Sequence, residues 1–449
     1  MGINVNDHYV FTLVIKIVKK INLYMIPYCC IFAKSNDYPR MVQDIRIEDY
    51  TYILPEDRIA RYPLAQRDDS KLLVYTNATG RVPENRKFRD LPDILPEKSL
   101  MVFNNTKVVP ARLLFQKDTG ALIEIFCLEP VSPSDYQLCF ASTASCRWKA
   151  IIGNIKRWKG GRLHLYIGED HRDAPLLAGM ALEAELIERG ETSVVAFHWQ
   201  GGYSFSQVME HAGRIPIPPY LKRDTEAIDL ERYQTWYARH EGSVAAPTAG
   251  LHFTQRELDA IDAKGMTRLN LCLHVGAGTF LPVKSETIGD HTMHSEPFSV
   301  SIDFLKALIS KGERPLTAVG TTSTRCLESL YYLGVHCLER GEPGVVEQWE
   351  PYRPEGYEYP LTAALSALVD YLGQTGQSEL TSRTRIIIVP GYRFRLVDYL
   401  VTNFHQPQST LLLLIGAFVG EAWRDIYDFA LQHDFRFLSY GDSSLLQKV

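Results

Sequence analysis

The sequence predicts an α/β main domain that is discontinuous along the chain and carries an inserted small antiparallel β-barrel domain. Strand and helix patterns alternate over residues 41–113 and again over 203–449, as they do in α/β proteins. Residues 114–202 instead form short alternating segments such as ALIEIFCLE and RLHLYIG, separated by Gly, Asp and Ser turns. That spacing is typical of a small antiparallel barrel, so we expect the barrel to interrupt the α/β domain.

In the main domain, residues 56–61 follow a proline and predict a short helix. Elsewhere, short apolar runs predict buried strands, and longer runs with helical spacing predict helices. The predicted strands cover residues 71–75, 100–103, 269–275 and 316–320, and the predicted helices cover 304–311, 325–332 and 410–432.

The composition is that of a globular protein: 45% of the 449 residues are hydrophobic, 22% are charged, and the formal net charge is −5. This excludes disordered, collagen-like and coiled-coil classes and argues against a generally basic nucleic-acid coat. The eight cysteines show neither C-x-x-C nor zinc-finger spacing. We therefore expect a reduced cytoplasmic protein without a disulfide scaffold or a metal site.

Residues 1–40 differ from the rest, with a net charge of +3 and apolar runs broken by Lys16, Lys19 and Lys20. The longest uncharged run, residues 21–33, is too short to span a bilayer. A signal peptide would place its basic residues before the apolar stretch rather than inside it. We therefore expect an N-terminal extension outside the fold, and no membrane association.

The barrel segment contains a basic stretch, because residues 136–168 include six Lys or Arg and no Asp or Glu. Trp148 and Trp158 lie within it. Positive charge beside aromatic side chains suits contact with loop or single-stranded RNA. A solvated barrel face over two core tryptophans explains the same residues equally well. The sequence leaves both an RNA contact and a solvated face open.

Polar loop segments outside the barrel are the candidates for chemistry. GSVAAPTAGLHFT, residues 242–254, has few large side chains, which suits a ligand lying close to the backbone, although a tight packed loop is the alternative. Residues 273–283 place Gly276 and Gly278 after a strand. A dinucleotide site is disfavoured because the third glycine is missing and Phe280-Leu281-Pro282 cannot open the required helix.

Two further segments follow the same logic. In LTAVGTTSTRCLESL, residues 316–330, a strand, a glycine and four hydroxyl residues precede a helix, which favours anion binding at the helix start over ordinary capping. The sequence Thr402-Asn403-Phe404-His405 offers an amide, an aromatic face and an imidazole.

His291, His294 and Glu296 could begin a metal site, but no third ligand can be placed, so a metal-free interpretation is favoured. The residues indicate an enzyme for a small anionic or nucleoside ligand and do not name a reaction.

Taken in order, these segments resemble the S-adenosylmethionine:tRNA ribosyltransferase-isomerases, the QueA family of queuosine biosynthesis. The resemblance runs from about residue 49 to 446 and rests on VFNNTKVVPARL, IPIPPYL, GSVAAPTAGLHFT, LHVGAGTF, AVGTTSTRCLES, TNFHQPQSTLLLLIGAF and RFLSYGDSSLL. The chain departs from the family pattern at Asn105, where the family often has Asp, and at Ser443-Ser444 after the SYGD motif. Residues 344–382 look like an insertion, and residues 1–40 have no counterpart.

The resemblance implies transfer and isomerisation of the ribosyl group of S-adenosylmethionine onto the 7-aminomethyl-7-deazaguanine (preQ1) base at wobble position 34 of tRNA. The products would be epoxyqueuosine-tRNA, adenine and methionine. The partners would be S-adenosylmethionine, as a co-substrate, and tRNA, with no cofactor, and the protein would be a cytoplasmic monomer. A SAM-dependent RNA methyltransferase and a non-catalytic RNA-binding module are the competing functions.

Roles for side chains are assigned within the motifs of this resemblance, except for the tRNA-contact candidates, which come from the basic stretch. His252 and His405 are expected to transfer protons, with Asp398 and Asp442 as further catalytic candidates; a structural role stays open for Asp398 and is favoured for Glu328. Thr321, Thr322 and Ser323 are expected to bind the methionine carboxylate, and the 242–250 loop the nucleoside. The substrate-binding candidates are Ser243, Pro247, Thr248, Gly250, His274, Gly276, Gly278, Thr321, Thr322, Ser323, Arg325 and Asn403, and the tRNA-contact candidates are Lys149, Lys156, Arg157, Lys159 and Arg162.

Overall fold

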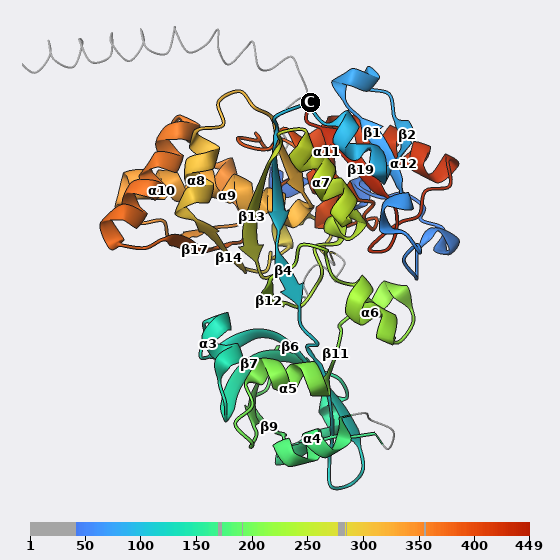
Figure 1. The fold of residues 1–449 in the computed structure, drawn as a ribbon, viewed down its shortest axis with the longest axis vertical. Coiled ribbons are helices and arrows are strands. Elements are labelled where there is room, and N and C mark those ends of the chain that lie inside the picture. The colour runs from blue at the N-terminus through green and yellow to red at the C-terminus, as the bar shows by residue number, and fades with distance from the viewer. Residues whose placement is uncertain (1–41, 169–172, 191, 277–282, 284, 354–355) are drawn as a thin grey trace, which may run out of the picture.

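A computed structural model describes residues 42–449 except 169–172, 191, 277–282, 284 and 354–355. The predicted extension, residues 1–40, and Gly278 lie outside the described residues. The described chain forms a large α/β part and a smaller β part joined by a narrow two-stranded connection (Figure 1). No helix among the described residues is long and apolar enough to cross a membrane.

The α/β part is built on a ten-stranded mixed sheet. Its order is β16 (Val345–Val346), β17 (Glu379–Thr384), β14 (Glu296–Ser301), β13 (Thr267–Leu273), β3 (Leu100–Asn104), β15 (Leu316–Val319), β18 (Tyr399–Asn403), β19 (Ser443–Gln447), β1 (Lys71–Tyr75) and β2 (Glu84–Lys87). The central strands β13, β3, β15 and β18 pair in parallel, while β19 returns antiparallel to β18. Strands β3 and β15 are buried along their whole length, which explains their unbroken apolar runs.

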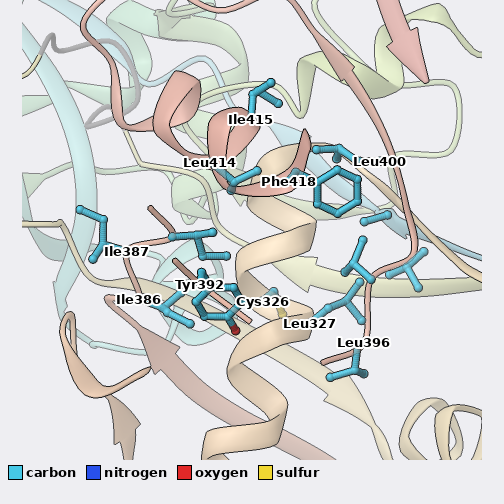
Figure 2. Packing of buried hydrophobic residues seen from close by; sticks show 14 of the residues in the cluster. Cys326, Leu327, Ile386, Ile387, Tyr392, Leu396, Leu400, Leu414, Ile415 and Phe418 are labelled. Carbon is cyan, nitrogen blue, oxygen red and sulfur yellow. The ribbon is translucent and has the colours of Figure 1, made fainter. Parts of the chain in front are cut away.

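Helices cover this sheet. They are α2 (Leu91–Ile94), α7 (Gln255–Ala263), α8 (Ile302–Ile309), α9 (Thr321–Arg340), α10 (Leu361–Thr375), α11 (Thr410–Val419) and α12 (Trp423–Gln432). The short helix α6 (Ala227–Arg232) lies apart from the sheet, beside the connection to the barrel (Figure 1). Residues 321–336 of α9 are buried on every side. Figure 2 shows why: Cys326 and Leu327 lie among side chains of α11, of β18 and of the 386–396 segment. The predicted helix over 410–432 is divided at Gly420, whose φ is +64°.

The smaller part is a closed antiparallel barrel, so the predicted fold class is confirmed. Six strands pair in the order β5 (Arg112–Gln116), β6 (Leu122–Ser132), β7 (Ser145–Ile152), β10 (Ser193–His198), β9 (Glu183–Glu188) and β8 (Arg162–Leu165), and β8 pairs with β5 to close it. The barrel's helices are α3 (Tyr136–Ala141), α4 (Ala174–Met180) and α5 (Phe205–Ala212), and the short strand β11 (Gly213–Arg214) pairs with β5. These elements extend beyond the predicted 114–202 segment because α5 buries Phe205, Val208 and Met209 in the barrel core.

The two parts are joined where β4 (Thr106–Val108) pairs in parallel with β12 (His240–Ser243), between the large sheet and the barrel (Figure 1). Side chains also connect them. The Tyr136 ring of α3 stacks on His274 at a centroid distance of 4.0 Å, and Arg383 of β17 donates to Glu129 of β6 at 2.9 Å. The barrel is therefore attached at the end of the sheet to which β13 runs.

Candidate active site

A cavity of about 780 Å³ lies at the carboxyl ends of β15 and β18. Ligands of open α/β sheets bind at this edge. The predicted residues Pro247, Thr248, Thr321, Thr322, Asn403 and His405 line it together with Ala245, Ala246, Ala249, Val275, Gly320, Thr402, Phe404, Gln406, Ser409, Leu411, Leu438, Ser439 and Tyr220. The predicted residues come from three segments that are far apart in the sequence, and these segments meet around one space.

The start of α9 forms one wall of the cavity. Gly320 precedes the helix with a φ of +97°, a conformation that favours glycine, and Thr321 and Thr322 line the space. The first backbone N–H groups of a helix have no intrahelical acceptor and carry the positive end of the helix dipole. This wall can therefore bind a carboxylate or phosphate oxygen.

Two side chains expected beside these threonines do not line the cavity. The Ser323 hydroxyl donates back to the Val319 carbonyl at 2.8 Å. Arg325 forms a buried ion pair with Glu296 and donates its Nε to the Ile386 carbonyl at 3.0 Å. Successive helical residues point in different directions, so the run of hydroxyl groups and Arg325 is divided between the cavity and the protein core.

His405 is the histidine in the cavity wall. Its Nε2 lies 3.0 Å from the Thr402 hydroxyl, its backbone N–H donates to Tyr427 Oη at 3.1 Å, and its carbonyl accepts from Tyr52. Within the described residues, Nδ1 has no hydrogen-bond partner. Burial lowers the pKa of His405 to about 3, so the ring is neutral at pH 7 and one of its nitrogens is a hydrogen-bond acceptor.

His252 lies behind the cavity wall. Its Nδ1 is 2.8 Å from Ser70 Oγ, and its Nε2 is 3.4 Å from Asn403 Oδ1. Asn403 Nδ2 donates to the Leu438 carbonyl at 2.9 Å, which turns its oxygen towards His252 and assigns the imidazole proton to Nε2. Burial lowers the pKa of His252 to about 4. The geometry makes His252 a support for Asn403, which itself lines the cavity.

The two candidate aspartates hold strands. Asp398 lies at the opposite edge of the sheet, where it accepts from the Leu316 N–H at 3.0 Å and pairs with Lys448 at 2.9 Å. Asp442 is buried and accepts from the backbone N–H groups of Lys71 at 3.0 Å and Arg436 at 2.8 Å. Neither carboxylate lines the cavity, so their placement differs from the catalytic position that we expected.

The 242–254 segment contributes in part. The Ser243 hydroxyl accepts from the Val275 N–H at 3.0 Å and donates to the Ala245 carbonyl at 2.9 Å, which fixes the backbone under the cavity. Gly250 does not line the cavity; a Cβ there would lie 2.0 Å from Tyr237 Oη, so packing requires this glycine.

The 273–283 segment points elsewhere. His274 is stacked on Tyr136 between the two parts of the molecule, and burial lowers its pKa to about 4. Gly276 does not line the cavity either. His294 pairs with Glu296 at 3.0 Å, and the described residues contain no group of three or more His, Cys, Asp or Glu side chains that could hold a metal ion.

Tyr220 and Ser439 are cavity residues that sequence reasoning did not single out. The Tyr220 hydroxyl lies 2.6 Å from Ser439 Oγ, so the two close one side of the space. Both stand inside quoted motifs, IPIPPYL and RFLSYGDSSLL, and this is the signal that could have found them.

The basic stretch of the barrel is divided by the strand pairing. Trp148 and Trp158 are fully buried in the barrel core and offer no stacking surface. Lys149 pairs with Glu129, and Arg162 pairs with Glu183 at 2.7 Å, across neighbouring strands. Lys156, Arg157 and Lys159 are exposed, and no ion pair to them is formed by the described residues. Of the five tRNA-contact candidates, these three have no acidic partner in the part of the chain that the structure describes.

Comparison with known proteins places the chain among tRNA-modifying enzymes. Residues 47–446 match the family described as queuosine biosynthesis protein. Relatives named S-adenosylmethionine:tRNA ribosyltransferase-isomerase are 37% identical over 406 residues in Trichlorobacter lovleyi and 39% identical over 417 residues in Mesorhizobium japonicum. These alignments cover 89% and 90% of this chain, respectively, and 99% of each relative.

A solved structure is also similar to this chain. The crystal structure of S-adenosylmethionine tRNA ribosyltransferase from Thermotoga maritima is 27% identical, covers 89% of this chain and 99% of its own, and has a TM-score of 0.42. The family match over residues 47–446 and the relatives' identity over nearly their full length lead to one conclusion: the chain belongs to the queuosine biosynthesis protein family.

Proposed function

We propose that this protein transfers and isomerises the ribosyl group of S-adenosylmethionine onto preQ1 at wobble position 34 of tRNA, giving epoxyqueuosine-tRNA, adenine and methionine. Family membership supports this activity. The observation that carries it is that His405 and the N-terminus of α9, which has no side-chain cap, line one cavity. S-adenosylmethionine is consumed as a co-substrate without a cofactor, and the enzyme acts in the cytoplasm as a monomer.

The reaction needs a series of bond changes that the cavity can organise. A base removes a proton from C5′, the carbon beside the sulfonium, which that charge acidifies. The C4′–O4′ bond breaks, and the freed oxygen expels adenine, which leaves with the electrons of its glycosidic bond and takes up the proton, so that C1′ becomes an aldehyde. The preQ1 amine adds to C4′ and loses a proton, and the resulting C5′ carbanion adds to C1′ and closes the carbon ring. The alkoxide formed at C1′ then displaces methionine from C5′, which leaves with the electron pair of the C–S bond as the epoxide closes. His405 is the base, because its imidazole lines the cavity and only its Nε2 is engaged, by the Thr402 hydroxyl, among the described residues. The N–H groups at Thr321 and Thr322 bind the methionine carboxylate.

The direct test incubates the protein with S-adenosylmethionine and tRNA carrying preQ1. We expect free adenine in solution and epoxyqueuosine in the nucleoside digest, both measured by mass spectrometry. The matched control is the same tRNA with guanine at position 34, which should release no adenine. Transfer of label from methyl-labelled S-adenosylmethionine to the tRNA would instead assign a methyltransferase, and RNA binding without adenine release would assign a non-catalytic module.

A further inference from the structure

A second pocket lies directly behind the cavity and shares Ser439 with it. The contact between His252 and Asn403 forms their common wall, since His252 lines the second pocket and Asn403 lines the cavity. The second pocket has a volume of about 290 Å³. It is lined by Arg67, Arg232, Arg436, His252, Ser70, Ser439, Tyr440, Gly441, Leu251, Leu64 and Pro63, and no carboxylate is among these described residues.

The guanidinium groups of the pocket are held by the backbone. Arg67 donates to the carbonyls of Gln234 at 2.6 Å, Glu231 at 2.9 Å and Leu251 at 3.2 Å. Arg232 donates to the carbonyls of Leu64 at 2.6 Å and Ala65 at 3.3 Å. Neutral carbonyls orient these cations without balancing their charge, and no carboxylate of the described residues forms an ion pair with either arginine.

Several N–H groups of these arginines have no acceptor among the described residues. Arg232 Nε is buried and has no hydrogen-bond partner among the described residues. Arg436 is the only one of the three arginines that the described residues pair with an acid, through a contact of 3.3 Å to Asp442. Burial, and next the charge of Arg232, lower the pKa of Arg67 to about 10. Like charges placed together in a partly buried site are unfavourable unless an anion joins them.

We propose that this arginine pocket binds a backbone phosphate of the tRNA beside the wobble nucleotide, which rests on the proposed function. Arginine forks match phosphate oxygens in a bidentate geometry. A base held in the cavity is joined to its own phosphates through a single sugar, so a phosphate reaches a pocket that shares a wall with the cavity. The methionine carboxylate has a separate partner in the N-terminus of α9.

The test combines a protein variant with a neutral phosphate. A set of tRNAs carrying preQ1 is assembled, each with a single methylphosphonate at a different linkage near position 34. Adenine release from each tRNA is measured with wild type and with Arg232→Gln. We expect Arg232→Gln to raise the KM for preQ1-tRNA without a methylphosphonate about ten- to hundredfold, because a charged hydrogen bond is lost. The KM for S-adenosylmethionine should change less than about twofold. One methylphosphonate should raise the wild-type KM to a similar extent and add nothing in the variant.

Controls separate a binding role from a structural one. Arg86→Gln removes an exposed arginine paired with Glu84 on the edge strand β2, and should leave both KM values unchanged. If Arg232→Gln unfolds, Arg232→Lys, which keeps the charge and loses the fork, replaces it in the same cycle. The proposal is overturned if the effects of Arg232→Gln and of the methylphosphonate on the KM for tRNA multiply at every linkage. It is also overturned if only the KM for S-adenosylmethionine rises, which would assign the pocket to the methionine carboxylate. A wild type that releases no adenine contradicts the proposed function itself.

Discussion

The cavity of the α/β part and the basic stretch of the barrel differ in how their polar groups are partnered. In the cavity, His405 Nδ1 and the first N–H groups of α9 have no partner among the described residues. On the barrel, Lys149 and Arg162 are paired with acids that neighbouring strands supply. A site is therefore indicated by polar groups that folding leaves without partners, rather than by the number of charges in a sequence segment.

The strongest test of this difference is His405→Ala. Because the substitution removes the cavity's neutral base, we expect kcat for adenine release to fall about 10²- to 10⁴-fold. His433→Ala, at an exposed histidine after α12, is the matched control and should keep nearly full turnover. Near-normal turnover in His405→Ala would remove it as the base.

A pH titration tests whether the two buried histidines are neutral. Their folded pKa values, about 3 for His405 and about 4 for His252, lie below the unfolded value of about 6.5. The unfolded chain therefore binds protons first as the pH falls, and the stabilisation present above pH 6.5 is lost below it. We expect His405 to contribute a loss of roughly 2–3 kcal/mol in the free energy of unfolding between pH 7 and 4.5.

Urea unfolding at both pH values measures this loss, and His405→Gln should show a smaller one than wild type. The acid limb of kcat/KM should correspondingly lie below pH 5 if His405 is the base. An activity that falls with a midpoint near 6.5 would show that the catalytic histidine is solvated in the free enzyme.

Much of the fold follows from local pattern. Period-two alternation over residues 145–152 places Trp148 inside the barrel, and the same rule turns Lys149 outwards. The acids that neutralise Lys149 and Arg162 come from β6 and β9, so only the strand register reveals them. The number of Lys and Arg residues in the 136–168 stretch therefore overestimates the unpaired positive charge on the barrel surface.

The sequence predicts a residue of the candidate site where the direction of the neighbouring strand decides at which edge of the sheet that residue lies. His405 follows β18 and reaches the carboxyl edge, whereas Asp398 precedes the same strand and lies at the other edge, so applying the edge rule excludes Asp398. Asp442 precedes β19, which runs antiparallel to β18. The start of β19 therefore lies beside the end of β18, so Asp442 lies near the cavity. Only its contacts with two backbone N–H groups show that its oxygens are already engaged.

The barrel side of the comparison is tested by two sets of substitutions. Neutralising Lys156, Arg157 and Lys159 together to Gln should raise the KM for tRNA about tenfold and reduce its salt dependence, because these charges lack acidic partners among the described residues. Lys149→Gln with Arg162→Gln should change the KM for tRNA less than about twofold, since those charges are already paired with Glu129 and Glu183. Equal effects of the two sets would place the tRNA contact elsewhere.

The smallest expected effect separates neighbouring hydroxyl groups of α9. Thr322 lines the cavity, whereas Ser323 donates to the carbonyl of Val319, the last residue of β15. Thr322→Val keeps the shape and removes one polar contact, so the KM for S-adenosylmethionine should rise about three- to tenfold at unchanged KM for tRNA. Ser323→Ala should leave both constants unchanged and lower only the melting temperature. The reverse pattern would mean that α9 turns its other face to the ligand, and that the free N–H groups at Thr321 and Thr322 do not bind the carboxylate.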